Sequence, residues 1–279
     1  MTTRFFRRLV QSPAAMAGGT ILAIVAAASL GAPRLAGHDP LEIVGAPFLW
    51  PGEDGAFPLG TDMLGRDILA GIVHGARISL QIGLAAGVAA ALIGLVVGAL
   101  AGYCGGWVDQ LLMRFAELFQ VMPSLLLTIV LVVIAGPSIA VIVAGIVVTS
   151  WPQVARLVRA ETLRLRHSEF IQAGIVIGMS DVAILARHVV PNALSPAVVM
   201  ISILAGNAIL TEAALSFLGL GDPNAMTWGS MIGSGREVLR SAWYMTALPG
   251  LAVLVTVTAL NLLGNGFNDL LNPRERGFL

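Results

Sequence analysis

The ionisable residues of this chain are few and scattered, which limits the chemistry that they could perform. Charged residues make up 11% of the 279 residues, against roughly a quarter in an average soluble domain. The four histidines, His38, His74, His167 and His188, are spread along the chain rather than grouped as metal ligands or as parts of a catalytic triad. The sequence therefore predicts no catalytic residue and no metal site. The one cysteine, Cys104, cannot form an internal disulfide.

The basic residues exclude one kind of nucleotide site. All 16 of them are arginine, so the chain has no lysine, and the phosphate-binding loop GxxxxGK[ST] requires one. We therefore expect the chain to bind no cofactor and to hydrolyse no ATP itself; an ATPase that drives it would be a separate polypeptide. The formal net charge of +0 gives no indication of a nucleic-acid partner.

Four ionisable residues fall in or beside apolar stretches, where a secondary transporter would place a proton relay. Asp109, Arg114 and Glu117 are close in sequence, and we interpret them as a local salt-bridge network rather than a relay. Glu212 lies toward one end of an apolar stretch. It either lines an outward cavity or caps local backbone donors, and the structural role is favoured.

The segment Glu169–Asn192 has the composition of an interaction surface. Glu169, Asp181, Arg187 and His188 make it too charged for hydrocarbon, yet it is too apolar for a solvated linker. An exposed apolar helix face normally contacts a partner. The alternative is a loop that folds back on its own bundle, and the residue types alone leave both open.

The first half of this segment is predicted to be a short helix. Ser168 is the expected N-cap, and the charge of Glu169 suits a helix N-terminus. The spacing i, i+3, i+4 and i+7 predicts an apolar face made of Phe170, Ala173, Gly174 and Ile177. Gly178 interrupts the pattern, so we expect the chain to bend there.

The second half is predicted to be another short helix. Ser180 and Asp181 are typical of a helix start. Pro191 is expected to end this helix, with Asn192 leading into the next apolar stretch. His188 is expected to form a hydrogen bond within the segment.

Six apolar stretches are long enough to cross a hydrocarbon layer of about 30 Å as helices. They run roughly over Ala14–Ala32, Ser79–Tyr103, Leu111–Ala135, Ser138–Val158, Ala193–Leu215 and Ala247–Phe267. With 57% hydrophobic residues, the sequence indicates an all-α integral membrane protein. The first stretch could instead be a signal peptide, but an even number of spans fits the charges better.

Arginine placement predicts the orientation of these spans. With the N-terminus inside, the cytoplasmic segments hold Arg4, Arg7, Arg8, Arg114, Arg156, Arg159, Arg164, Arg166, Arg187, Arg274 and Arg276. The outer segments hold Arg34, Arg66, Arg77, Arg236 and Arg240. Both termini and the segment Glu169–Asn192 are therefore expected on the cytoplasmic side.

Two outer segments contain residues that are typical of turns. The sequence GTDMLGRD places Asp62 and Asp67 near Arg66, with Thr61 as a candidate N-cap for a short interfacial helix. These residues either cap and pair locally or form a landing surface for a partner. In the second outer segment Trp228 suits a membrane interface.

Five stretches, in order, resemble the permease subunits of ABC importers for dipeptides, oligopeptides and nickel. They are Pro58–Leu80, Gly102–Leu127, the loop signature Gln172-Ala173-Gly174 with Gly178 and Pro191, Glu212–Ile232, and Asn261–Arg274. The first and fourth resemble the C-type subunit, which pairs with a B-type permease. The family pattern has Glu and Ala where this chain has Gln172 and Gly174. We expect docking to survive, although Gly weakens a helix by about 1 kcal/mol relative to Ala.

The resemblance implies a type I importer permease of the MetI-like fold with six transmembrane helices. It divides the chain into a cytoplasmic N-terminus (1–13), a first transmembrane helix (14–32), an extracytoplasmic segment (33–78), a core permease domain of five helices with a coupling loop (79–270, loop 159–192) and a cytoplasmic C-terminus (271–279). The membrane would be the bacterial inner membrane.

The resemblance also implies the partners and the sites. The partners are a B-type permease, two ATPase subunits or domains that use ATP and Mg, and an extracytoplasmic substrate-binding protein. The ATPase-coupling residues would be Glu169, Phe170, Ile171, Gln172, Ala173, Gly174, Ile177, Gly178, Ser180 and Asp181, supported by Arg187, His188, Pro191 and Asn192. The binding-protein face would hold Gly60, Thr61, Asp62, Gly65, Arg66, Asp67 and Trp228, with Glu212 as the cavity candidate.

The expected function is import of dipeptides or oligopeptides, or of a related solute such as a nickel chelate or glutathione, driven by ATP hydrolysis in the partner subunits. A channel or secondary transporter that works without ATP is the alternative. A membrane-bound enzyme is a further class, but no cluster of catalytic residues supports it.

Overall fold

A computed structural model describes residues 12–271 of the chain, with side chains to residue 268. Within that range the chain is helical, and one isolated β-bridge joins Thr61 to Asp67. The helices are α2 (Pro13–Leu30), α3 (Ala32–Leu35), α4 (Ile68–Cys104), α5 (Gly106–Val121), α6 (Ser124–Ala135), α7 (Ile139–Arg166), α8 (Glu169–Val176), α9 (Asp181–Ile184), α10 (Val190–Phe217), α11 (Trp228–Gly235) and α12 (Tyr244–Leu271). A π-helical turn, Leu185–Val189, joins α9 to α10, and a 3₁₀ turn, Arg236–Val238, follows α11.

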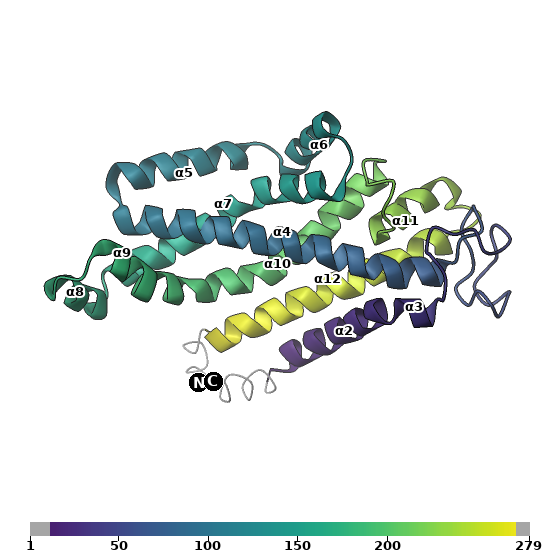
Figure 1. Cartoon of the computed structure of the whole chain (residues 1–279), viewed down its shortest axis with the longest axis horizontal. Coiled ribbons are helices and arrows are strands. Elements are labelled where there is room, and N and C mark those ends of the chain that lie inside the picture. The colour runs from purple at the N-terminus through teal and green to yellow at the C-terminus, as the bar shows by residue number, and fades with distance from the viewer. Residues whose placement is uncertain (1–11, 272–279) are drawn as a thin grey trace.

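The long helices form an elongated bundle around α4 (Figure 1). Glycines let the neighbouring helices approach closely, as small residues do in membrane bundles. A Cβ atom on Gly87 would lie 2.9 Å from the Ile201 carbonyl oxygen of α10, and one on Gly102 would lie 2.8 Å from the Arg159 carbonyl oxygen of α7. These contacts give the glycines of α4 a packing role.

Five helices, counting Asp181–Phe217 as one, are long and apolar enough to cross a membrane. A sixth crossing is possible if α5 and α6 are taken together, but these two helices meet at an angle of 83°. The predicted stretch Leu111–Ala135 is therefore not one straight helix. The break falls at Met122 and Pro123, because proline lacks the backbone donor and disfavours helical geometry in the residue before it.

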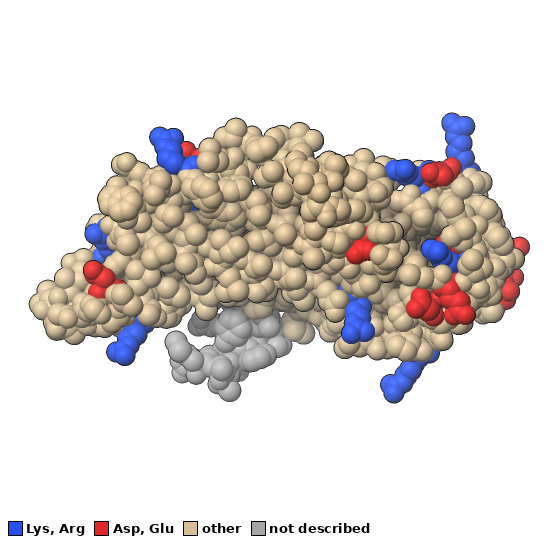
Figure 2. Space-filling model, turned by 45° about the horizontal axis from the view of Figure 1, so that its top comes forward, with Lys and Arg blue, Asp and Glu red and all other residues tan. Residues whose placement is uncertain are grey.

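The charged residues agree with a membrane-spanning bundle. Figure 2 shows charged side chains toward both ends of the molecule and a broad middle belt without them on the face in view. One end carries α8 and α9, and the other carries α11 and the irregular segment 37–67 (Figure 1). We call these the α8 end and the α11 end.

One predicted boundary changes. Helix α4 begins at Ile68, inside the segment 33–78 that was expected to be extracytoplasmic, because Asp67 caps it well before the apolar run starts. Its 37 residues extend about 55 Å, more than a hydrocarbon layer requires. The arginines Arg4, Arg7, Arg8, Arg274 and Arg276, which contributed to the predicted orientation, lie outside the described residues.

Candidate functional site

Helix α8 begins at Glu169, as predicted, but its cap differs. Ser168 occupies the N-cap position without capping the helix through its side chain. Its hydroxyl instead donates to the Leu165 carbonyl oxygen at 2.5 Å. Ser168 therefore holds the predicted N-cap position, but its side chain bonds the end of α7 instead of capping α8.

One side of α8 is anchored in a small core. Ile171 is fully buried and packs with Tyr103, Ile184 and Val189. Gly174 is buried on the same side, where an added Cβ would meet the Met179 sulfur at 3.4 Å. Gly174 was predicted on the apolar docking face, so that part of the prediction is wrong: the helix turns this residue toward its own base.

The rest of α8 and its C-cap present apolar side chains to the surroundings. Val176 is 85% exposed and Ile177 is 76% exposed, while Phe170 and Ile175 are about half exposed. Ala173 is exposed among them. We call these five residues the α8 face. Exposed apolar surface of this kind on an anchored helix is a contact surface for a partner.

The chain bends after α8 as predicted. Gly178 has φ +80°, a left-handed conformation that glycine adopts without steric cost. The Met179 amide donates to the Gly174 carbonyl oxygen at 3.0 Å, which closes the helix end. Ser180 then caps α9 by accepting from the Ala183 amide at 3.4 Å. Glu169 and Gln172 are exposed, and the Gln172 amide donates to the Arg166 carbonyl oxygen at 3.0 Å.

Pro191 does not end the second helix. The chain continues from α9 through the π-helical turn into α10, and Pro191 lies in the first turn of α10. The Val190 amide reaches back to the Leu185 carbonyl oxygen, a π-type bond that widens the helix where proline cannot donate. Asn192 donates to the His188 carbonyl oxygen at 2.6 Å, and Arg187 is exposed.

Two long-range contacts hold this segment and its neighbours, and sequence reasoning missed both. The Tyr103 hydroxyl donates to Asp181 Oδ1 at 2.7 Å, which ties the end of α4 to the start of α9. The Arg159 guanidinium donates through two nitrogens to the Asp109 carboxylate, which ties α7 to α5. The predicted local salt bridge between Arg114 and Glu117 is confirmed at 3.0 Å, but the prediction is wrong for Asp109, which pairs with Arg159 instead.

At the α11 end, the residues of GTDMLGRD point mostly inward. Thr61 is fully buried; its hydroxyl donates to the Ala46 carbonyl oxygen at 2.5 Å and accepts from the Leu49 amide at 3.0 Å. Thr61 is thus not a helix cap. Asp67 takes that role for α4 by accepting from the Leu69 amide at 2.9 Å.

The remaining residues of this motif shape the turn. Gly60 and Gly65 are buried with φ +78° and +84°. Asp62 accepts from the backbone amides of Leu64 and Arg66, each at 2.8 Å. Because most of the motif is buried, it acts as a scaffold, and only Asp62 and Arg66 retain partial exposure from the predicted binding-protein face.

Trp228 is a core residue rather than an interfacial one. It is 1% exposed, and its indole Nε1 donates to the Ile72 carbonyl oxygen at 2.9 Å. In this structure it cannot touch a partner. Glu212 is also buried, and its Oε1 accepts from the hydroxyls of Ser216 and Thr227, both at 2.7 Å. Glu212 therefore bonds side-chain hydroxyls, not the backbone donors that were expected.

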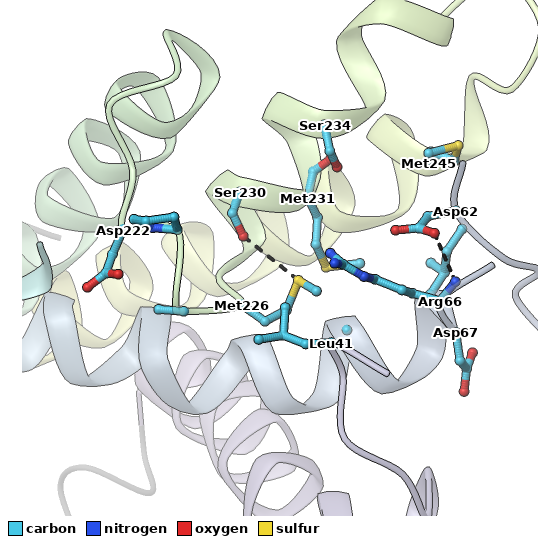
Figure 3. A pocket seen from close by; sticks show the side chains of 14 residues that line it. Leu41, Asp62, Arg66, Asp67, Asp222, Met226, Ser230, Met231, Ser234 and Met245 are labelled. Carbon is cyan, nitrogen blue, oxygen red and sulfur yellow. Dashed lines mark hydrogen bonds between the residues drawn. The ribbon is translucent and has the colours of Figure 1, made fainter. Parts of the chain in front are cut away.

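A cavity of about 120 Å³ lies at the α11 end between the start of α4, α11 and α12 (Figure 3). The Arg66 side chain extends into it toward Met231, and its Nε is buried without a hydrogen-bond partner. Ser230 lies in the same lining and bonds the Met226 sulfur at 3.8 Å. Among the described residues, no group of three or more His, Cys, Asp or Glu side chains could hold a metal.

The helical spans and the anchored α8 face define a multi-pass membrane protein with a partner-binding segment at one end. The family described as "Binding-protein-dependent transport system inner membrane component" matches residues 94–277. "N-terminal TM domain of oligopeptide transport permease C" matches residues 1–53. The chain belongs to this family of ABC importer permeases, and it has the MetI-like fold.

Three relatives illustrate the similarity. The di/tripeptide transport system permease protein DppC of Pseudomonas aeruginosa is 35% identical, over 97% of this chain and 91% of its own. The glutathione transport system permease protein GsiD of Pectobacterium atrosepticum is 38% identical, over 97% and 90%. The dipeptide transport system permease protein DppC of Alkalihalophilus pseudofirmus is 36% identical, over 78% and 72%.

This membership makes the chain a membrane permease component of a binding-protein-dependent importer, a transport subunit and not itself an enzyme. A permease of this class works with an ATPase and a substrate-binding protein.

Proposed function

We propose that the chain is the C-type permease of an importer that carries dipeptides, oligopeptides or a related small solute such as glutathione. The relatives named above transport di/tripeptides, dipeptides or glutathione. All of these solutes contain amide bonds. A nickel chelate is a further solute class that the sequence resemblance allows.

The α8 face is the proposed contact with the ATPase. It is the single observation that carries the proposal: Phe170, Val176 and Ile177 face outward while Ile171 is fully buried behind them. The helix can therefore bind in a groove on a partner while Ile171 stays packed against its own chain. Because packed elements switch between discrete arrangements, movement of α8 with the ATPase would pass into the bundle.

The proposed assembly contains a second, B-type permease and two ATPase subunits or domains, which use ATP and Mg. The α8 end faces the cytoplasm. Supporting this orientation, the described arginines of the α8 end, such as Arg156, Arg164 and Arg187, outnumber the outer ones. The α11 end then faces outward, where the substrate-binding protein delivers solute. The membrane is the inner membrane of a bacterium, with both termini cytoplasmic.

The test is a charge placed in the α8 face. Ala173→Arg introduces a cation into the proposed apolar contact, and Gln110→Arg adds the same charge to an exposed position of α5. We expect Ala173→Arg to lose both the co-purifying ATPase and peptide uptake, at an unchanged amount of chain in the membrane. Gln110→Arg should retain both.

Normal uptake and ATPase recovery with Ala173→Arg would refute the docking role of the α8 face. A complex that retains its ATPase but imports no peptide with the unaltered chain would refute the solute class alone.

A further inference from the structure

Two asparagines lie exposed in the middle of membrane-spanning helices. Asn207 belongs to α10 and Asn261 to α12, and both side chains are exposed. Asn207 lies ten residues before the end of α10, about 15 Å of helix, and Asn261 lies in α12 beside Gly206 of α10. Helix α10 ends toward the α11 end of the bundle (Figure 1). Both amides therefore lie well inside segments that are long and apolar enough to cross a hydrocarbon layer about 30 Å thick.

The two amides belong to one open face. Helices α10 and α12 pack side by side, and a Cβ on Gly206 would lie 3.4 Å from Val257 Cγ1 and 3.9 Å from Asn261 Oδ1. Asn261 thus reaches the flank of α10 one residue away from Asn207. Asn265 is one helical turn beyond Asn261 and is exposed as well. We call Asn207, Asn261 and Asn265 the amide track.

Lipid chains cannot form hydrogen bonds with the side-chain amides of this face. The side-chain amides of Asn207 and Asn261 form no hydrogen bond within the described part of the chain. A polar group that is left unpaired in hydrocarbon costs several kcal/mol in general. By contrast, the exposed face of α4 carries apolar side chains such as Leu92 and Val96 at 56% and 57% exposure. The α10–α12 face also exposes Leu210 and Leu254, at 47% and 61%, so it is mixed in character, but its amides require contact with water or polar groups.

We propose that the amide track lines the water-filled path of the solute and hydrogen-bonds its amide groups. A primary amide offers two N–H donors and a carbonyl acceptor, so it can serve both the C=O and the N–H of a peptide bond. It carries no charge that would hold a zwitterionic solute too tightly to be released. This inference rests on the proposed function, because it assumes that the transported solute contains amide groups.

The test uses single cysteines in the complete complex in native membrane vesicles. Cys104 is the one native cysteine and is exposed, so Cys104→Ala provides the background. Into it we place Asn207→Cys, Asn261→Cys or the lipid-facing control Leu92→Cys. The measurement is the rate of labelling by a charged, membrane-impermeant methanethiosulfonate, with and without a transported dipeptide. Thiols react as thiolates, which form only where water reaches them.

We expect both asparagine positions to label at least about tenfold faster than Leu92→Cys, and the dipeptide to slow them. Two independent positions keep the test usable if one variant does not assemble. Labelling as slow as that of Leu92→Cys at both positions, with peptide uptake intact, would overturn the amide track and leave the proposed function standing.

A second measurement separates water access from solute recognition. Asn207→Leu removes the amide, and Asn207→Gln retains it on a longer side chain. We expect Asn207→Leu to raise the KM for dipeptide uptake by about tenfold, the change expected from one lost hydrogen bond, with Asn207→Gln closer to the parent and ATPase co-purification unchanged in both. Fast labelling together with an unchanged KM in Asn207→Leu would overturn solute recognition by the track.

Discussion

The α8 end and the α11 end of the bundle arrange their motif residues in opposite ways. At the α8 end, a helix of eight residues buries Ile171 and turns Val176 and Ile177 outward. At the α11 end, Thr61, Asp67 and Trp228 are all buried and bond backbone groups. A motif with polar and glycine residues thus forms a contact surface at one end of the bundle and a buried scaffold at the other.

The difference has a physical basis. A short helix that must enter a partner can only be held from one side, so its contacts with its own chain are few and local. A long irregular segment such as 37–67 must satisfy many backbone donors and acceptors by itself, and its polar side chains are used for that purpose. Substitutions should therefore affect stability at the α11 end and coupling at the α8 end.

The largest effect is expected at Trp228. Trp228→Ala leaves a cavity in the core of the α11 end and an unpaired Ile72 carbonyl, and should cost about 3 kcal/mol or more of stability. The measurement is the thermal stability of the purified complex. Trp243→Ala is the matched control, because Trp243 is 56% exposed. Equal losses from both variants would contradict the scaffold role of Trp228.

A smaller effect is expected at the tie between α4 and α9. Tyr103→Phe removes only the hydroxyl that donates to Asp181, worth about 1 kcal/mol. We expect fewer peptides imported per ATP hydrolysed and faster hydrogen exchange in α9, while ATPase co-purification persists. Asp181→Asn keeps an acceptor and should remain closer to the parent.

The chain has two tyrosines, and the second provides the control for that experiment. Tyr244 donates to the Leu49 carbonyl oxygen at 2.9 Å at the α11 end. Tyr244→Phe should loosen segment 37–67 without changing the ratio of uptake to ATP hydrolysis. An equal drop of this ratio in both variants would show that the Tyr103 hydroxyl has no special part in coupling.

The smallest effect is expected at Gln172, where the family pattern has Glu. Gln172→Glu places a carboxylate in the first half of α8, where it favours the helix by a few tenths of a kcal/mol. It also gives up the bond from the Gln172 amide to the Arg166 carbonyl oxygen. We expect about twofold tighter retention of the ATPase, measured by titrating the purified subunit. Gln110→Glu on α5 should change nothing, and weaker retention in Gln172→Glu would contradict the expectation.

Local signals in the sequence predicted local structure well. The start of α8 at Glu169, the bend at Gly178 and the start of α9 after Ser180 follow from residues that act on their immediate neighbours, and all three are confirmed. The same reasoning predicted that Pro191 ends the second helix, and that prediction was wrong. The π-helical turn before Pro191 allows the helix to continue although proline has no backbone N–H to donate. The residue types do not predict that turn.

The failures at Asp109 and Trp228 share another cause. Asp109 bonds Arg159, which is fifty positions away in sequence, and Trp228 bonds a carbonyl of α4. Which side chain reaches which depends on how helices distant in the sequence pack. Spacing within one segment carries no information on that.

By itself, the sequence determined that this is a helical membrane protein without an ATPase loop, and where its short helices begin and bend. Those properties depend on composition and on hydrogen bonds that close within a few residues. Only the tertiary structure decided which side of α8 faces outward, which motif residues are buried at the α11 end, and that the amides of α10 and α12 share one face. Those properties depend on the direction in which each packed helix is turned, which the whole bundle sets.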